Sequence, residues 1–210
     1  MCRDVATTIL AQSLGTKYLL DAQALDRIRE VLREGGLIVY PTDTAYGLGA
    51  DPFQPKAVDR LFVAKARPRD QAISMAVAGI PEVFRFGERT PIAQAFCEKN
   101  LPGPYTVVLR ATGEAPRPIL STEGRIALRV PDHPIPRLLA KAIGPVTATS
   151  ANRHGRPSPT TCEGAREQFG DRVDLYLDAG PTPLGGESTV VDLTGPRARI
   201  LRPGTARSGA

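Results

Sequence analysis

The chain of 210 residues is long enough for one substantial domain, or for two small ones that share a core. A hydrophobic fraction of 41% without any tryptophan is typical of a globular protein with a mainly aliphatic core. The net charge of +5 favours an anionic partner such as a nucleotide, a phosphate or a nucleic acid; an arginine-rich surface without function is the alternative.

Residues 1–20 form an N-terminal extension that carries charged side chains and lacks an apolar core of signal-peptide length. No segment approaches the roughly 18 apolar residues of a membrane span. The three cysteines are isolated and lack CxxC spacing, so neither a disulfide framework nor a structural zinc site is expected. We therefore expect a soluble, cytoplasmic protein that does not contact a membrane.

Helices and strands alternate along the first half of the chain. Asp21 is placed to cap a helix that runs to about Glu34. A buried strand over 37–40 and a loop over 42–49 follow, and Gly47-Leu48-Gly49 in that loop is expected to be a plain turn. The next predicted elements are a helix from Pro55 to Lys65, a strand over 73–77, a weaker helix over 90–99 and a strand over 105–109.

The second half continues in the same way. We expect strands over 126–130 and 146–149 around a helix over 134–143, and then a loop over 150–159. Thr160 and Glu163 have the spacing of a capping box for a helix toward Phe169. Three more strands are expected near 175–177, 190–193 and 200–201, followed by a disordered tail over 206–210.

This alternation predicts a single α/β domain over residues 21–205, built on one twisted, mixed open sheet flanked by helices. The order of the strands cannot be deduced from the sequence.

Several common catalytic groups are scarce. The only two histidines, His133 and His154, lie in predicted loops, so a catalytic triad or a histidine metal site is poorly supplied. No phosphate-binding loop of the GxxxxGK[ST] type occurs, and no GxGxxG follows a strand. No metal ligand is predicted.

Three segments remain as candidates for chemistry. Lys65-Ala66-Arg67 ends a predicted helix, where two cations can bind phosphate or carboxylate, or can simply complement the helix dipole. Thr147–Asn152 places hydroxyls and an amide at a strand end, a common position for ligand loops, although such residues also form ordinary turns. Gly185–Thr189 is a loop of the same kind, with a hairpin turn as its alternative.

An ordered set of motifs makes a resemblance specific. The run from Val39 to Gly49, VYPTDTAYGLG, resembles the opening motif of the YrdC-like threonylcarbamoyl-AMP synthases, and Lys65-x-Arg67-Pro68 follows at the family spacing. The later motifs, in the family order, are Leu101-Pro102-Gly103-Pro104, Leu128-Arg129-Val130-Pro131, Ser150-Ala151-Asn152, Ser188-Thr189-Val190-Val191-Asp192 and Leu201-Arg202-Pro203-Gly204. The resemblance covers Gly35 to Gly204, most of the chain.

The resemblance implies a YrdC-like fold in its short, single-domain form. It also implies a nucleotidyltransferase that joins L-threonine, bicarbonate or CO2, and ATP into threonylcarbamoyl-AMP and pyrophosphate. In the family this product goes to a separate transferase complex that makes N6-threonylcarbamoyladenosine in tRNA. Mg²⁺ is expected to accompany ATP.

The family's functional residues are carried over by motif position. The resemblance assigns threonine binding to Thr44, Arg129, Ser188 and the backbone at Ala148. It assigns catalysis to Lys65 and Arg67, and ATP binding to Arg67, Gln71, Ser150, Asn152, Ser158 and Arg202. Because the substrates supply both nucleophiles in this reaction, the protein need only orient them and offset their charge. The scarcity of histidine agrees with this requirement.

Three positions depart from the family pattern. Gln71 stands where many relatives have Asn or Lys in contact with ATP, and Gln can still form a hydrogen bond there. Ala76 stands where relatives often have a histidine that helps to hold threonine, so replacing it with histidine is expected to tighten threonine binding if the site lacks a donor there. Arg125 stands where a small hydroxyl residue near ATP is common.

Two other functions are weighed against this one. A non-catalytic binder of tRNA or double-stranded RNA would explain the basic charge but not the ordered motifs, and weak RNA binding is kept as an additional partner. A synthase of the same fold with another acceptor, such as the carbamoyl-adenylate-forming domains of hydrogenase maturation, belongs to much longer chains with zinc-finger segments.

Overall fold

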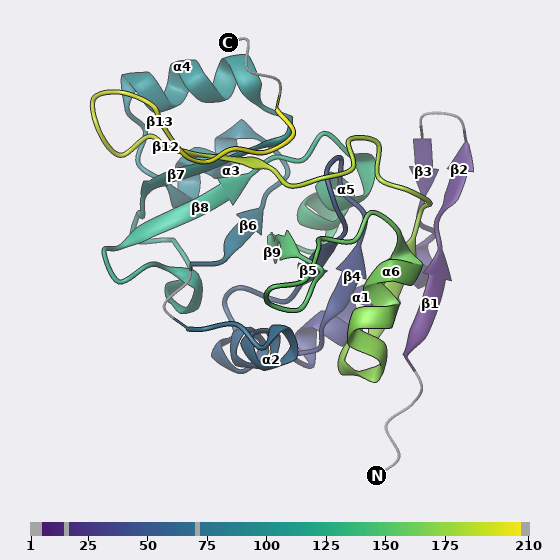
Figure 1. The fold of residues 1–210 in the computed structure, drawn as a ribbon. Coiled ribbons are helices and arrows are strands. Elements are labelled where there is room, and N and C mark those ends of the chain that lie inside the picture. The colour runs from purple at the N-terminus through teal and green to yellow at the C-terminus, as the bar shows by residue number, and fades with distance from the viewer. Residues whose placement is uncertain (1–5, 15–16, 70–71, 207–210) are drawn as a thin grey trace.

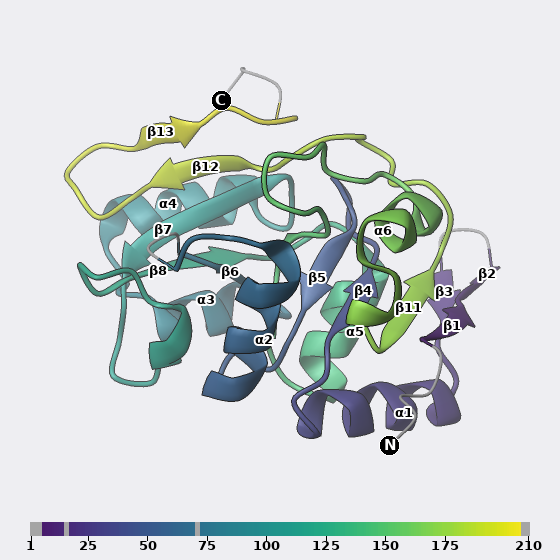
Figure 2. The same ribbon diagram turned by 60° about the horizontal axis from the view of Figure 1, so that its bottom comes forward.

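The computed structural model describes residues 6–14, 17–69 and 72–206, which fold around two mixed β-sheets (Figures 1 and 2). The five-stranded sheet has the order β1 (Thr7–Leu10), β11 (Leu175–Asp178), β4 (Ile38–Tyr40), β5 (Gly47–Gly49) and β10 (Thr149–Ser150). The six-stranded sheet has the order β13 (Arg199–Arg202), β12 (Thr189–Asp192), β7 (Tyr105–Arg110), β8 (Arg125–Arg129), β6 (Ser74–Ala76) and β9 (Val146–Thr147). Strands β2 (Gln12–Leu14) and β3 (Lys17–Leu19) form a separate hairpin.

Helices cover both sheets. Helices α3 (Ile80–Phe86) and α4 (Pro91–Asn100) pack on β8 and β7 of the six-stranded sheet, and α1 (Ala22–Arg33) and α6 (Cys162–Phe169) pack on β4 and β11 of the five-stranded sheet. Helix α5 (Pro134–Ala142) contacts β6 and β3, and α2 (Pro55–Lys65) contacts a short 3₁₀ turn over Arg117–Ile119. Among the described residues, every helix is too short or too polar to span a bilayer.

One hydrophobic core joins the two sheets. Leu48 of the five-stranded sheet, Leu61 of α2 and Leu128 of the six-stranded sheet belong to the same cluster of buried side chains. A core shared in this way makes the two sheets a single domain. The α/β class, the mixed pairing and the flanking helices are therefore confirmed, but the expected single sheet is in fact two.

Several sequence predictions hold at residue level. The side chain of Asp21 accepts a hydrogen bond from the Ala24 amide at 2.7 Å and caps α1. Helix α2 spans Pro55–Lys65 as predicted. The predicted strands over 105–109 and 126–130 form as β7 and β8, each shifted by one residue at one or both ends.

Gly47-Leu48-Gly49 was expected to be a turn, and this prediction is wrong. These residues form β5, which pairs with β4 and β10. A Cβ atom on Gly49 would lie 2.8 Å from the Ile38 side chain, and one on Gly47 would lie 3.0 Å from the Tyr40 ring. The glycines are therefore required by a close approach to β4, and not by a turn.

The predicted capping box before α6 is also wrong. Thr161, and not Thr160, caps the helix, because its Oγ1 accepts from the Gly164 amide at 3.1 Å. The Thr160 carbonyl instead accepts from the Thr182 amide at 2.8 Å. Helix α3 has no counterpart among the predicted elements.

The N-terminal segment contributes to the fold, because β1 pairs in parallel with β11 at the edge of the five-stranded sheet. The domain boundary at residue 20 stays a prediction. Of the predicted tail, only Ala206 belongs to the described residues.

Candidate functional site between the two sheets

A cavity of about 430 Å³ lies where the two sheets meet, lined by residues of both. The chain crosses from one sheet to the other at this point. The strand predicted over 146–149 is divided at Ala148: β9 pairs with β6 of the six-stranded sheet, and β10 pairs with β5 of the five-stranded sheet. Side chains from distant parts of the sequence therefore converge on the cavity.

The backbone of Ala148 is fixed against Ser74. Its amide donates to the Ser74 carbonyl at 2.7 Å, and its carbonyl accepts from Ser74 Oγ at 3.0 Å. A carbonyl oxygen has two lone pairs, so only the second lone pair at Ala148 is left for a ligand. The predicted contact at Ala148 can thus accept a hydrogen bond from a ligand amine.

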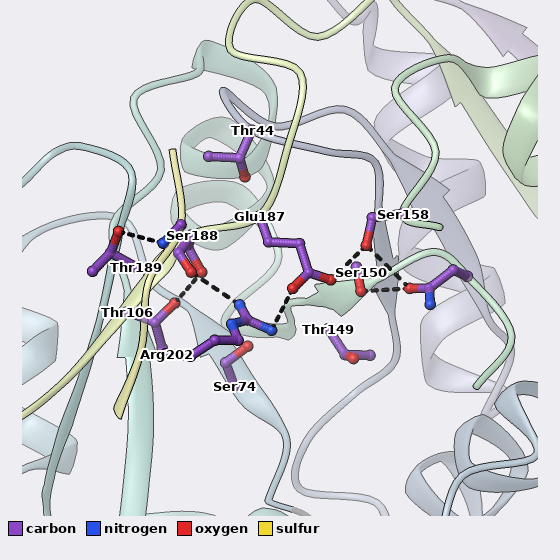
Figure 3. Close-up of polar contacts among 12 residues, drawn as sticks. Thr44, Ser74, Thr106, Thr149, Ser150, Ser158, Glu187, Ser188, Thr189 and Arg202 are labelled. Atoms are coloured by element: carbon purple, nitrogen blue, oxygen red, sulfur yellow. Dashed lines mark hydrogen bonds and ion pairs between the residues drawn. The ribbon is translucent and has the colours of Figure 1, made fainter. Parts of the chain in front are cut away.

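One end of the cavity is suited to a carboxylate. Arg129, which is 4% exposed, donates from NH1 to Thr44 Oγ1 at 2.7 Å and from NH2 to Asp43 Oδ1 at 2.6 Å. Ser188 lies nearby on the loop before β12 and shares a hydrogen bond of 2.8 Å with Thr106 (Figure 3). A buried guanidinium beside hydroxyl groups is a strong site for a carboxylate.

The other part of the cavity gathers cations and hydroxyls suited to phosphate. Arg67, Ser150 and Arg202 line it. Ser158 Oγ donates to Glu187 Oε1 at 2.6 Å, and Glu187 Oε2 pairs with Arg202 NH1 at 2.7 Å, so one carboxylate bridges two predicted ATP contacts (Figure 3). An incoming nucleotide phosphate would compete with Glu187 for both groups.

Arg202 reaches the cavity because the end of the chain packs directly on the backbone before β12. A Cβ atom on Gly204 would lie 2.4 Å from the Glu187 carbonyl oxygen, so only glycine fits there. The Gly204 amide donates to Thr189 Oγ1 at 3.0 Å, and Arg202 NH2 donates to the Ser188 carbonyl at 3.0 Å. The C-terminal strand is thus tied to the loop that carries Ser188.

Lys65 does not line the cavity. It is 2% exposed, and its ammonium group donates to the carbonyls of Ser150 and of Asn152, the latter at 2.6 Å. Burial, and secondly the charge of Arg67, lower the pKa of Lys65 from its ordinary value of 10.5 to about 7, while Glu187 opposes the shift. Lys65 therefore holds the Ser150–Asn152 segment from beneath.

A Schellman motif at the end of α2 separates Lys65 from Arg67. Ala66 has the left-handed φ of 50°, with its amide bonded to the Val63 carbonyl and the Arg67 amide bonded to the Phe62 carbonyl. This conformation is usual for glycine at a helix end and costs alanine some strain. It turns the chain so that Lys65 stays in the interior while Arg67 lines the cavity, with NH1 3.4 Å from Thr149 Oγ1.

The predicted residues divide into three groups. Those that line the cavity are Thr44, Arg67, Arg129, Ala148, Ser150, Ser188 and Arg202. Lys65, Asn152 and Ser158 lie behind it and support it through Ser150 and Glu187. Gln71 lies outside the described residues. Arg125, noted as a departure from the family pattern, also lines the cavity and pairs with Glu123 at 2.8 Å.

Sequence reasoning missed Glu187, Asp43 and Thr106. Glu187 lies in the loop Gly185–Thr189, and Asp43 lies in the motif Val39–Gly49. An acidic residue next to a predicted anion site is a signal that could have identified both as partners of the cationic side chains. Thr106 gave none, because it occupies an ordinary strand. Among the residues that the structure describes, no three His, Cys, Asp or Glu side chains converge as a metal site.

Ala76 is fully buried and does not line the cavity. It packs in the second core cluster with Tyr40, Ile135 and Val146. Ser74, two residues earlier on the same face of β6, lines the cavity, so the tighter threonine binding expected for a histidine at Ala76 stays a prediction.

Ala76→His is also expected to lower the free energy of unfolding by about 1–3 kcal/mol, because a larger side chain must be placed at a fully buried position. Thermal or denaturant unfolding measures this, and Ala198→His, at an exposed loop position, is the matched control. An Ala76→His variant as stable as the wild type would contradict the stability prediction.

Comparison with known proteins agrees with this site. The family model Sua5/YciO/YrdC, described as "Telomere recombination", matches residues 30–204. The chain belongs to the Sua5/YciO/YrdC family. Its members include the threonylcarbamoyl-AMP synthase of Pyrococcus abyssi, which is 38% identical over 82% of this chain and 52% of that protein. The threonylcarbamoyl-AMP synthase of Vibrio campbellii is 30% identical over 85% of this chain and 98% of its own length.

A solved structure of this family, P. abyssi Sua5 complexed with L-threonine, superposes with a TM-score of 0.87 at 33% identity. The match covers 95% of this chain and 58% of that one, so this chain spans a little over half of the P. abyssi protein. The YrdC-like fold predicted from the motifs is confirmed.

Proposed function

We propose that this chain is an L-threonylcarbamoyladenylate synthase, a nucleotidyltransferase that joins L-threonine, bicarbonate or CO2, and ATP. The observation that carries the proposal is a single cavity with a buried arginine beside two hydroxyl residues, Thr44 and Ser188, at one end and a group of cations and hydroxyls at the other. The names of relatives at 30–38% identity support the same reaction.

The chemistry requires two substrate nucleophiles and none from the protein. The threonine amine attacks the carbon of bicarbonate, which releases water and leaves a carbamate. A carbamate oxygen then attacks the α-phosphorus of ATP, the bond to the β-phosphate oxygen breaks, and pyrophosphate leaves. The catalytic work of the protein is to hold the reactants in line and to offset their negative charge.

The residues are assigned to these tasks by position. Arg129, Thr44 and Ser188 bind the threonine carboxylate and hydroxyl, and the Ala148 carbonyl accepts from the amine that attacks. Arg67, Arg202 and Ser150 bind the phosphates of Mg·ATP, with Asn152 and Ser158 holding Ser150 and Glu187. Lys65 acts on the phosphate-binding part of the cavity indirectly, through its hydrogen bonds to the Ser150–Asn152 segment. Gln71 remains a proposed ATP contact from the sequence resemblance alone.

The cellular role follows from the product. Threonylcarbamoyl-AMP is an activated acyl donor, so a separate transferase complex must consume it, and we propose that this complex modifies adenosine in tRNA. The proposed compartment is the cytoplasm, which suits the buried free thiols of Cys97 and Cys162. Direct, weak binding of tRNA or double-stranded RNA is kept as an addition to this role.

Mass spectrometry of the product tests the proposal. With ATP, threonine and ¹³C-bicarbonate, we expect threonylcarbamoyl-AMP one mass unit heavier than with ordinary bicarbonate, formed with stoichiometric pyrophosphate and without RNA. Omission of either threonine or the carbon source should abolish pyrophosphate release. Product formed only from carbamoyl phosphate would favour the synthase with another acceptor, and RNA binding without turnover would favour the binding module.

A further inference from the structure

Asp43 forms a buried ion pair with the arginine of the carboxylate end, yet it is not itself part of the cavity wall. The side chains of Asp43 and Arg129 are 4% and 5% exposed, and their closest atoms lie 2.6 Å apart. Arg129 and Thr44 line the cavity, whereas Asp43 does not. Asp43 therefore contacts the guanidinium without lining the cavity itself.

The guanidinium of Arg129 is left with donors for a ligand. It has five N–H groups, of which NH1 gives one to Thr44 Oγ1 and NH2 gives one to Asp43 Oδ1. Its Nε is buried and lacks a hydrogen-bond partner among the described residues. Two hydrogen bonds to different partners restrict the orientation of this planar group.

Asp43 is itself held in place. Its carbonyl accepts from the Leu184 amide at 3.0 Å, and the neighbouring Thr44 carbonyl accepts from Thr182 Oγ1 at 2.8 Å and from the Gly186 amide at 3.0 Å. The loop that contains Asp43 is thus clamped to the segment that leads to Glu187 and Ser188. Because this loop is held by several hydrogen bonds, the Asp43 carboxylate can fix the position of the Arg129 guanidinium.

We propose that Asp43 is a positioning residue for substrate recognition: it orients the Arg129 guanidinium so that the remaining donors meet the carboxylate of the amino-acid substrate. The inference rests on the proposed function, since it takes threonine as that substrate. Loss of Asp43 should weaken recognition of the substrate carboxylate more than recognition of any other part of the molecule.

The test compares L-threonine with L-threoninol, in which a hydroxymethyl group replaces the carboxylate, by calorimetric titration of the full chain. For Asp43→Asn we expect the threonine Kd to rise at least tenfold and the ratio of the threoninol Kd to the threonine Kd to fall at least fivefold. The Kd of a non-hydrolysable ATP analogue should change less than threefold. A merely structural role would weaken both amino-acid ligands alike and leave the ratio unchanged.

Asp174→Asn is the matched control, because Asp174 also pairs with an arginine, Arg60, at 2.8 Å and accepts from a backbone amide, that of Leu37, away from the cavity. It should leave the ratio of the two Kd values at the wild-type value. If Asp43→Asn fails to fold, Asp43→Glu replaces it: the ion pair is kept, but the guanidinium is displaced by about one methylene, and the ratio should again fall.

An unchanged ratio in the folded Asp43 variant would overturn the inference and leave the proposed function standing. A wild-type chain that binds no threonine would overturn both.

Discussion

Lys65→Met is expected to lower the rate of threonylcarbamoyl-AMP formation at least tenfold, which corresponds to about 1.4 kcal/mol of transition-state stabilisation. Lys65 Nζ donates to the carbonyls of Ser150 and Asn152, and methionine fills a similar space without a donor. The Ser150 hydroxyl, which lines the phosphate half of the cavity, would then lose its fixed position. Lys65→Ala should lose at least as much.

Steady-state kinetics with ATP and threonine varied separately measure the effect. Because Lys65 lies behind the phosphate half, the change should appear in the turnover number and the ATP KM, with little change in the threonine KM. Lys56→Met is the matched control, since Lys56 is exposed on the same helix and should behave as wild type. A Lys65→Met enzyme with wild-type turnover would show that the ammonium has no part in the reaction.

The pH dependence of stability supplies a second readout for Lys65. The folded chain releases the Lys65 proton near pH 7, whereas the unfolded chain keeps it to about pH 10.5, its ordinary pKa. Between these values the unfolded state binds more protons, so the stability of the wild type relative to Lys65→Met should rise with pH. Denaturant unfolding at pH 6.5 and pH 9 measures this difference, and an equal difference at both values would contradict the buried, perturbed amine.

Arg67→Ala should also reduce synthesis at least tenfold, for a different reason. Arg67 lines the cavity, where its guanidinium is the proposed partner of the ATP phosphates, so its removal deletes a charge that faces the substrate. Both the ATP KM and the turnover number should suffer, because the charge on the phosphates grows as pyrophosphate leaves. Arg67→Lys should recover only part of the activity, since lysine lacks the planar two-donor group.

Arg69→Ala is the control for this variant. Arg69 lies two residues further along the chain, and its exposed side chain pairs with Asp59 on the surface and stacks on Phe62. Removal of a surface ion pair of this kind costs at most about 1 kcal/mol of stability and should leave turnover unchanged. Equal losses in Arg67→Ala and Arg69→Ala would point to a general loss of basic charge, and not to a specific phosphate contact.

The site could be predicted from the sequence largely because its residues lie in ordered motifs. Thr44, Arg67, Arg129, Ser188 and Arg202 all line one cavity, although Thr44 and Arg202 are far apart in the chain. Motif order identifies such residues without any knowledge of the path between them. It does not say which side chain faces the ligand, and for that reason Lys65 was expected among the catalytic contacts while the structure places it behind Ser150.

The starts of helices α1 and α2 could be predicted from the sequence, because they depend on interactions between residues close together in the chain. Asp21 caps α1 through an amide three residues away, and Pro55 begins α2, because both effects act within one helical turn. Composition and alternation were enough for the α/β class, and the motif set was enough for the family and for the need for cations without a protein nucleophile.

Long-range contacts decided the rest. Gly47 and Gly49 have the composition of a turn, and only their close approach to Ile38 and Tyr40 makes them a strand. The division of 146–149 at Ala148, and with it the two sheets, depends on pairing with β5 and β6, at least 70 residues earlier in the chain. The buried pair Asp43–Arg129 and the partly exposed pair Glu187–Arg202 exist for the same reason: the partners of these charges are determined by the tertiary fold, and a linear sequence does not contain their distances.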